Sequence, residues 1–269
     1  MKRFDPSRFT TTKAKPLPVY LLLDVSKSME GEKIKALNLA VREMLETFAK
    51  NTASGSQIVV SIITFGGVAR MLLRPTPASQ VRWTDMGVDG NTPMGAAIAV
   101  AKNLIEDRDA TPSRGYRPTV ILVSDDEPND EWEGPLDNFV GQGRSSKCDR
   151  MAMAIGVDAA RATKALERFI AGTPHQLFVA GDASRIHEFF KGVTMSVTAR
   201  THSVDPNRIP AVSESKQDAA PDKQRASEAP PSVPLDSSSG SVSSEAKSKR
   251  KSTKKGPGPS AADAEDGYW

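Results

Sequence analysis

The chain is poor in residues that form covalent cross-links or bind transition metals. Among its 269 residues there is one cysteine, Cys148, which excludes an internal disulfide and any zinc site built from several cysteines. The three histidines, His175, His187 and His202, do not have the spacing of metal ligands. We therefore interpret these four residues as structural or incidental.

Long apolar segments and a strong net charge are also absent. The basic N-terminus lacks the apolar stretch of a signal peptide, and no window approaches the roughly 18 apolar residues of a membrane span. The formal net charge of +3 is small for this length, so it does not indicate a nucleic-acid-binding protein or a protein with acidic substrates. These absences favour a cytoplasmic protein that does not contact membranes.

Apolar residues are concentrated in the first part of the chain. From about position 201 onward, Ser, Pro, Ala and Lys predominate without periodicity, and there is little material for a core. We therefore expect a flexible arm over residues 1–15, a folded domain over 16–200 and a disordered tail over 201–269.

Within the expected domain, short apolar segments alternate with segments of helical periodicity. PVYLLL (18–23) is continuous and apolar, as in a strand covered on both faces, and the hairpin QIVVSIITFGGVARMLL is expected to turn at Gly66 and Gly67. Further strands are predicted at PTVILVSD, RMAMAIGV and QLFVA, with a Gly-rich connection after the first of them, and helices at GEKIKALNLAVREMLETFAK, TPMGAAIAVAKNLIED, DAARATKALERFIAG and DASRIHEFFKGVTMSVT. The pattern predicts an α/β fold: a doubly wound, mostly parallel six-stranded sheet with one antiparallel edge strand and helices on both faces.

Polar residues stand where the predicted parallel strands end. In such sheets, ligands bind at the carboxyl ends of the strands, where successive connections leave toward opposite faces. Asp24, Ser26 and Ser28 alternate in DVSKS after the first strand, Thr92 precedes a helix, and Asp125 follows VILVS. Carboxylate and hydroxyl oxygens are hard ligands, which suit Mg²⁺, Mn²⁺ or Ca²⁺. We expect the five residues to hold such an ion and to leave one position for an anionic oxygen of a partner.

The combination of DVSKS, the threonine of GNTPMG and the aspartate of SDDEPND resembles the von Willebrand factor A (vWA) domain with its metal-ion-dependent adhesion site (MIDAS). LPVYLLLDVSKSM and VSIITFGGVAR are similar to the bacterial TerY-like branch, which is encoded with tellurium-resistance and stress-response genes. The resemblance implies a non-catalytic adaptor that binds an Asp or Glu carboxylate of a protein partner through the metal. Ter-type proteins, kinases or phosphatases encoded nearby are the partners it implies.

The last motif departs from the usual Thr-Asp-Gly of that family. Here it is Ser124-Asp125-Asp126, and the additional carboxylate of Asp126 is a candidate for indirect contact with the metal. Its neighbours Glu127 and Asp130 are more typical of a solvated acidic rim than of ligands.

Two other readings of the aspartate and hydroxyl pattern remain open. Asp24 with its serines, or Thr92, could cap the helix that follows. Asp24 could instead be the nucleophile of a haloacid-dehalogenase-like, Mg²⁺-dependent phosphatase, although the general acid expected two residues later is replaced by Ser26.

The tail carries two segments of possible function. KSKRKSTKK (247–255) is a basic run that is either a solvated linker or a weak contact for nucleic acid or an acidic protein. Tyr268 and Trp269 are the tail's only aromatic residues, and they could anchor a docking peptide because large rings supply much contact area at little ordering cost.

Overall fold

A computed structural model describes residues 14–51, 55–156 and 160–207. These residues form one six-stranded sheet with the order β3-β2-β1-β4-β5-β6. The strands are β1 Lys15–Asp24, β2 Ser56–Gly66, β3 Val68–Pro77, β4 Thr119–Ser124, β5 Asp149–Ile155 and β6 Phe178–Ala180. All neighbouring pairs are parallel except β2 and β3, which are antiparallel. The predicted sheet, with its single antiparallel edge strand, is confirmed.

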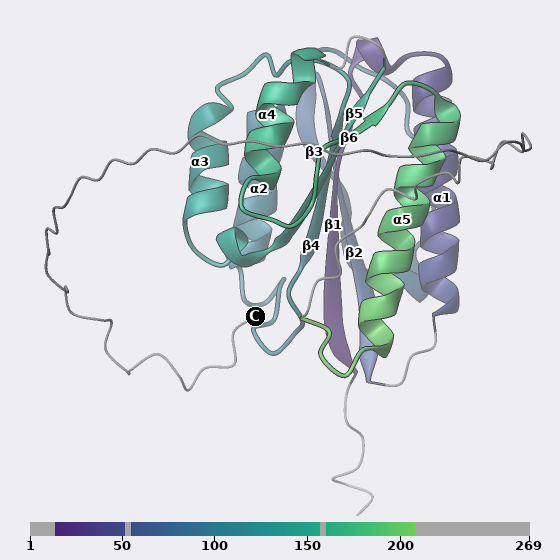
Figure 1. Cartoon of the computed structure of the whole chain (residues 1–269), viewed down its shortest axis with the longest axis vertical. Helices are drawn as coiled ribbons and strands as arrows, with labels where there is room; N and C mark the ends of the chain where they lie inside the picture. Colours follow the sequence, from purple (N-terminus) through teal and green to yellow (C-terminus); the bar gives the residue numbers. More distant parts are fainter. Residues whose placement is uncertain (1–13, 52–54, 157–159, 208–269) are drawn as a thin grey trace, which may run out of the picture. The chain divides into compact units, whose positions relative to one another are not determined.

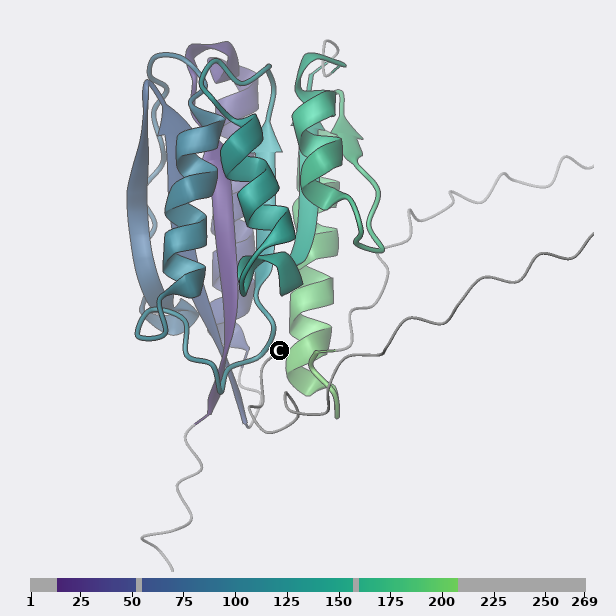
Figure 2. The same ribbon diagram turned by 90° about the vertical axis from the view of Figure 1, so that its left-hand side faces the viewer.

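Helices cover both faces of this sheet (Figures 1 and 2). Helices α1 (Glu32–Lys50) and α5 (Ala183–His202) lie side by side on one face, and α2 (Met94–Glu106), α3 (Glu133–Gly141) and α4 (Ala160–Ile170) lie on the other. In the described residues, three short 3₁₀ helices lie in connections between a strand and a helix: η2 Lys27–Met29, η3 Ala78–Gln80 and η4 Ser145–Lys147. Each face of the sheet thus has its own hydrophobic core.

The central strand β1 is buried on both sides. Leu21 and Leu23 pack into the core beneath α1 and α5, whereas Tyr20 and Leu22 pack into the core beneath α2, α3 and α4. The unbroken apolar run of this strand follows from the alternation of its side chains between two covered faces.

Helix α3 was not predicted, because its segment reads as part of a Gly-rich connection. It is nine residues long and contains Gly134, Pro135 and Gly141, which weaken any helical pattern. Leu136 and Phe139 are nevertheless fully buried against the sheet. Tertiary packing therefore stabilises a helix that local propensity does not favour.

Strands β1 and β4 are neighbours whose following connections go to opposite faces. The chain leaves β1 toward α1 and leaves β4 toward α3, so the connections after these two strands lie on opposite faces of the sheet. Open α/β sheets bind ligands at such a point.

The described residues extend past position 200. Helix α5 ends at His202, and the Asn207 side chain accepts a hydrogen bond from the Arg117 backbone N–H at 2.8 Å. The expected arm is almost wholly outside the described residues, as are the basic run, Tyr268 and Trp269 of the tail. In the described ranges, no helix is long and apolar enough to cross a membrane.

Candidate metal-binding site at the ends of β1 and β4

Asp24 is the last residue of β1 and is completely buried. Its Oδ1 accepts a hydrogen bond from the Ser26 backbone N–H at 2.8 Å, and its Oδ2 accepts one from Ser124 Oγ at 2.5 Å. Burial raises the pKa of Asp24 to about 6, although hydrogen bonds from both serines oppose the shift. An ionised Asp24 at neutral pH is therefore a poorly solvated anion, which a nearby cation would stabilise.

A chain of hydroxyls joins this end of β1 to Asp125. The Ser26 and Ser28 hydroxyls are hydrogen-bonded at 2.9 Å, and Ser28 Oγ donates to Asp125 Oδ1 at 2.7 Å. Ser26 is buried, whereas Ser28 is exposed at the rim. The alternation in DVSKS thus brings both serines to one side, as the sequence predicts.

The loop carrying Thr92 is held against the DVSKS segment by backbone contacts. The Lys27 N–H donates to the Gly90 carbonyl at 3.0 Å, and the Asp89 N–H donates to the Val25 carbonyl at 2.8 Å. A Cβ atom on Gly66 would lie 2.5 Å from the Val25 carbonyl oxygen, so the close approach requires glycine there. Thr92 itself is buried at the mouth of α2.

Helix capping does not account for these hydroxyls. Pro93 is the N-cap of α2, and Ser26 makes no side-chain cap to η2. Asp130 takes the capping role for α2, because its two oxygens accept hydrogen bonds from the Gly95 and Ala96 N–H groups at 3.0 and 2.9 Å. Asp130, which the sequence places on an acidic rim, is partly exposed and also caps a helix.

Asp126 lies next to the cluster and is partly exposed. Its Oδ1 accepts a hydrogen bond from the Glu127 backbone N–H at 2.8 Å, and its carbonyl oxygen is 3.2 Å from Ser124 Oγ. These contacts shape the loop after β4. An indirect role for Asp126 at a metal stays a prediction.

Sequence reasoning missed two contributors to this cluster, Ser124 as a donor to Asp24 and Lys33 as an ion-pair partner. Lys33 Nζ, from the first turn of α1, lies 2.7 Å from Asp125 Oδ2 and 3.2 Å from the Ser28 carbonyl oxygen. The Ser124 position was visible as part of the SDD motif, but a lysine five residues after Ser28 carries no recognisable signal.

The donor set suits a hard divalent cation. It offers two carboxylates and three hydroxyl groups, and no nitrogen or sulfur ligand. Among the described residues, no group of three or more His, Cys, Asp and Glu side chains could hold a metal ion. A metal at this rim would therefore depend on serine and threonine hydroxyls as well as carboxylates.

The histidines with described partners and the cysteine are engaged elsewhere. His175 Nε2 pairs with Asp149 at 2.7 Å, His187 Nδ1 pairs with Glu43 at 2.9 Å, and burial raises the pKa of the Cys148 thiol far above its usual range. These contacts agree with a structural interpretation of the three residues.

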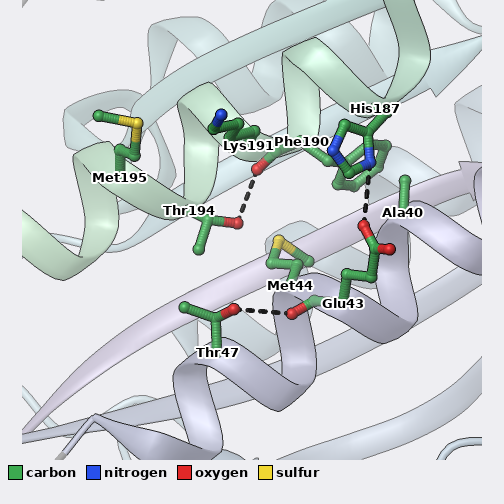
Figure 3. A pocket seen from close by; sticks show the side chains of 9 residues that line it. All are labelled: Ala40, Glu43, Met44, Thr47, His187, Phe190, Lys191, Thr194 and Met195. Atoms are coloured by element: carbon green, nitrogen blue, oxygen red, sulfur yellow. Dashed lines mark hydrogen bonds and ion pairs between the residues drawn. The ribbon is translucent and has the colours of Figure 1, made fainter. Parts of the chain in front are cut away.

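A groove of about 310 Å³ lies on the flank of the domain, between α1 and α5, and contains none of the candidate ligands (Figure 3). Its lining is Ala40, Glu43, Met44, Thr47, His187, Phe190, Lys191, Thr194 and Met195. The Glu43 and His187 side chains pair across one end of it.

Residues 19–127 match the model of the von Willebrand factor type A domain. Together with the sheet topology, this match shows that the described part of the chain has the vWA fold. A comparison with curated proteins finds no match.

Solved structures support the same fold. The von Willebrand factor type A protein from Catenulispora acidiphila has a TM-score of 0.53 at 19% identity over 68% of this chain and 43% of its own. Proximal thread matrix protein 1 from the mussel byssus, with a zinc-occupied MIDAS motif, has a TM-score of 0.50 at 15% identity. The match covers 67% of this chain and 45% of that protein. The pilus adhesin SpaC from Lactobacillus rhamnosus GG has a TM-score of 0.56 at 13% identity, and the match covers 69% of this chain and 30% of that protein. This chain thus spans less than half of each of these proteins, and such low identities show the fold alone.

The phosphatase alternative is not supported. The residue two positions after Asp24 is Ser26, which cannot act as a general acid at neutral pH, and its backbone N–H is committed to the Asp24 carboxylate. The vWA fold gives this alternative no support either.

Proposed function

We propose that this vWA domain is a metal-dependent protein-protein interaction module. In this proposal Asp24, Ser26, Ser28, Thr92 and Asp125 hold one divalent cation, and the partner supplies an Asp or Glu carboxylate. The observation that carries the proposal is the hydrogen-bonded run from Asp24 through both serines to Asp125, which lies where β1 and β4 diverge.

Each group has a distinct part in this proposal. Asp24 and Asp125 supply negative charge from buried positions, whereas the hydroxyls contribute neutral oxygens. A cation held mainly by neutral oxygens retains a strong attraction for a further anion, and the exposed Ser28 lies at the open side of the rim. Bound Mg²⁺ would supply the charge that a partner carboxylate ligates, and Mn²⁺ or Ca²⁺ would suit the same oxygens. The zinc-occupied MIDAS of the mussel protein supports a divalent ion in this fold.

The biological setting is inferred from the resemblance to the TerY-like branch. We infer a cytoplasmic, non-catalytic adaptor in a bacterial stress-response, tellurium-resistance-like or defence system. Ter-type proteins, a kinase or a phosphatase are the partners that this setting suggests. One of the structural neighbours, SpaC, is a pilus adhesin, in keeping with an interaction module.

Calorimetric titration with MgCl₂ tests the metal site directly. The wild type should bind one ion, and Asp24→Ala should abolish binding while leaving the circular dichroism spectrum unchanged, because the substitution removes an anion from a pair of nearby carboxylates. Asp85→Ala, which removes an exposed carboxylate of η3's connection to α2, is the control and should bind as the wild type does. Unchanged Mg²⁺ affinity in Asp24→Ala would overturn the assignment.

Affinity capture of partners separates the metal rim from the tail. Capture through the rim should require Mg²⁺, fail with EDTA and with Asp24→Ala, and survive removal of residues 208–269, which leaves the packed Asn207 in place. Capture through the basic run would persist in EDTA and weaken steeply with salt. Capture through Tyr268 and Trp269 would vanish when those two residues alone are removed.

A further inference from the structure

Lys33 occupies the rim of the candidate metal site from the first turn of α1. Its ammonium group lies 2.7 Å from Asp125 Oδ2 and 3.2 Å from the Ser28 carbonyl oxygen. The side chain of Asp125 is completely buried, whereas that of Lys33 is 36% exposed. A partly exposed cation therefore neutralises a buried anion inside the site.

The path of the lysine stem is set by Gly156, the residue after β5. A Cβ atom at Gly156 would lie 3.3 Å from Lys33 Cε and 3.4 Å from Lys33 Nζ. The end of the lysine side chain therefore packs against the backbone of Gly156, where there is no side chain. Gly156 has a φ of 100°, which L-residues with side chains rarely adopt. Three elements of the fold thus meet around this ammonium group: the start of α1, the end of β4 and the end of β5.

Both oxygens of Asp125 are already used in this arrangement. Oδ1 accepts from Ser28 Oγ, and Oδ2 accepts from Lys33 Nζ. A divalent ion bound by the same carboxylate and the same serine would lie within a few ångströms of the ammonium group. Two cations at such a distance repel each other strongly where water is partly excluded.

We propose that Lys33 is a tethered competitor for the metal: its ammonium group neutralises Asp125 and must swing into solvent before a divalent cation binds. The inference rests on the proposed metal site and adds the residue that sets its affinity. Lys33 can move because four rotatable bonds separate its charge from the helix and more than a third of the side chain already contacts water. At a low concentration of divalent ions, the Lys33 ammonium group neutralises Asp125. At a higher concentration, the divalent ion displaces it.

Calorimetry on the full chain tests the competition. Lys33→Met keeps most of the apolar stem and removes the charge, and it should tighten Mg²⁺ binding about tenfold relative to the wild type. Lys35→Met is the matched control, because it makes the same change in net charge on the same helix, at a lysine paired with Glu32 on the exposed surface. That control should stay within about twofold of the wild type, since exposed charges are screened.

A second measurement follows the lysine itself. Reductive methylation read by mass spectrometry should label Lys33 slowly in EDTA and faster in saturating Mg²⁺, whereas Lys35 should be labelled equally in both. In Asp24→Ala, Mg²⁺ should not change the labelling of Lys33.

The outcomes distinguish this proposal from the one on which it rests. Equal Mg²⁺ affinity in Lys33→Met and Lys35→Met, with binding still lost in Asp24→Ala, would overturn the competition and leave the metal site intact. Weaker binding in Lys33→Met would also overturn it, because Lys33 would then position Asp125 for the metal. If neither the wild type nor Lys33→Met binds Mg²⁺, Mn²⁺ or Ca²⁺, both proposals are wrong.

Discussion

Two clusters of buried charge lie at opposite ends of the same sheet. One surrounds Asp149 at the start of β5, and the other surrounds Asp24 and Asp125 at the ends of β1 and β4. In the first, a buried arginine and a histidine face one carboxylate. The second has two carboxylates, and one partly exposed lysine, Lys33, pairs with Asp125. In the first cluster, buried side chains pair with the negative charge of the carboxylate, and we call it the balanced cluster. The second, which we call the unbalanced cluster, carries an excess of negative charge.

The balanced cluster fastens the end of α5 to the sheet. The guanidinium of Arg200 donates to the Pro206 and Arg117 carbonyls and to Thr119 Oγ1 at 2.6–2.7 Å, and it lies 3.9 Å from Asp149. Burial lowers the pKa of Arg200 to about 10, so the group still carries its charge at neutral pH. The fixed contacts leave Arg200 only 1% exposed, so this charge serves the fold.

The unbalanced cluster is less constrained. Its hydroxyls are hydrogen-bonded to each other and to Asp125, and both Ser28 and Lys33 reach the solvent. Groups that must exchange one cation for another need such freedom. The comparison suggests that a buried charge with a saturated set of internal contacts is structural, whereas a buried charge with replaceable contacts is available for binding.

The largest effect is expected at the balanced cluster. Arg200→Met removes two buried hydrogen bonds and one part-buried one and leaves Asp149 without its arginine, which should lower the free energy of unfolding by about 3–5 kcal/mol in urea titrations. Arg42→Met removes an exposed pair with Asp85 and should cost less than about 1 kcal/mol. Similar losses in the two variants would contradict the structural role of Arg200.

At the other end of the sheet, removing the charge of Asp24 should raise the free energy of unfolding, whereas Arg200→Met lowers it. The pKa of Asp24 is raised to about 6 in the folded state, so the folded protein binds a proton more tightly than the unfolded chain does. Ionisation of Asp24 therefore weakens the fold as pH rises from about 4 to about 6. In EDTA, Asp24→Asn should gain up to about 3 kcal/mol over the wild type at pH 7 and little at pH 4.

Thermal or urea unfolding across this pH range measures the difference. Asp85→Asn is the control: the Arg42 hydrogen bond lowers the pKa of Asp85, so its contribution is present at neutral pH and is lost as pH falls. A loss of stability in Asp24→Asn at pH 7 would show that the carboxylate is structural, like Asp149.

The smallest effect is expected at Asp126. Asp126→Gly should weaken Mg²⁺ affinity by less than about tenfold, because its carboxylate is partly exposed and already accepts from the Glu127 N–H. Glu127→Gly removes the same charge one residue further on and serves as the control in calorimetry. Complete loss of binding in Asp126→Gly would mean that Asp126, and not Asp125, is the ligand.

Much of the fold could be predicted because it follows from local patterns. The continuous apolar run of β1, the Gly66-Gly67 turn and the apolar stripe of α1 each indicate one element, and the rules for parallel connections then limit the topology. Helix α3 could not be predicted, since Gly134 and Pro135 hide a helix that only packing stabilises.

The candidate site was predictable to the extent that topology brings strand ends together. The positions of Asp24 and Asp125 follow from the strands that precede them, and the structure joins them through Ser26 and Ser28. Their binding of a metal stays a prediction. The capping role of Asp130 could not be foreseen, because the N–H groups that donate to it lie 34 and 35 residues away at the start of α2.

The sequence by itself thus determined which strands form, that they build a doubly wound sheet, and which carboxylates and hydroxyls stand at its carboxyl edge. Periodicity and strand-end position are properties of neighbouring residues, so they can be read along the chain. Only the tertiary structure decided that Lys33 pairs with Asp125, that Ser124 binds Asp24, and that Arg200 closes the opposite end against Thr119. These contacts join residues 81 to 100 positions apart, and they depend on side-chain reach and packing, which no local pattern encodes.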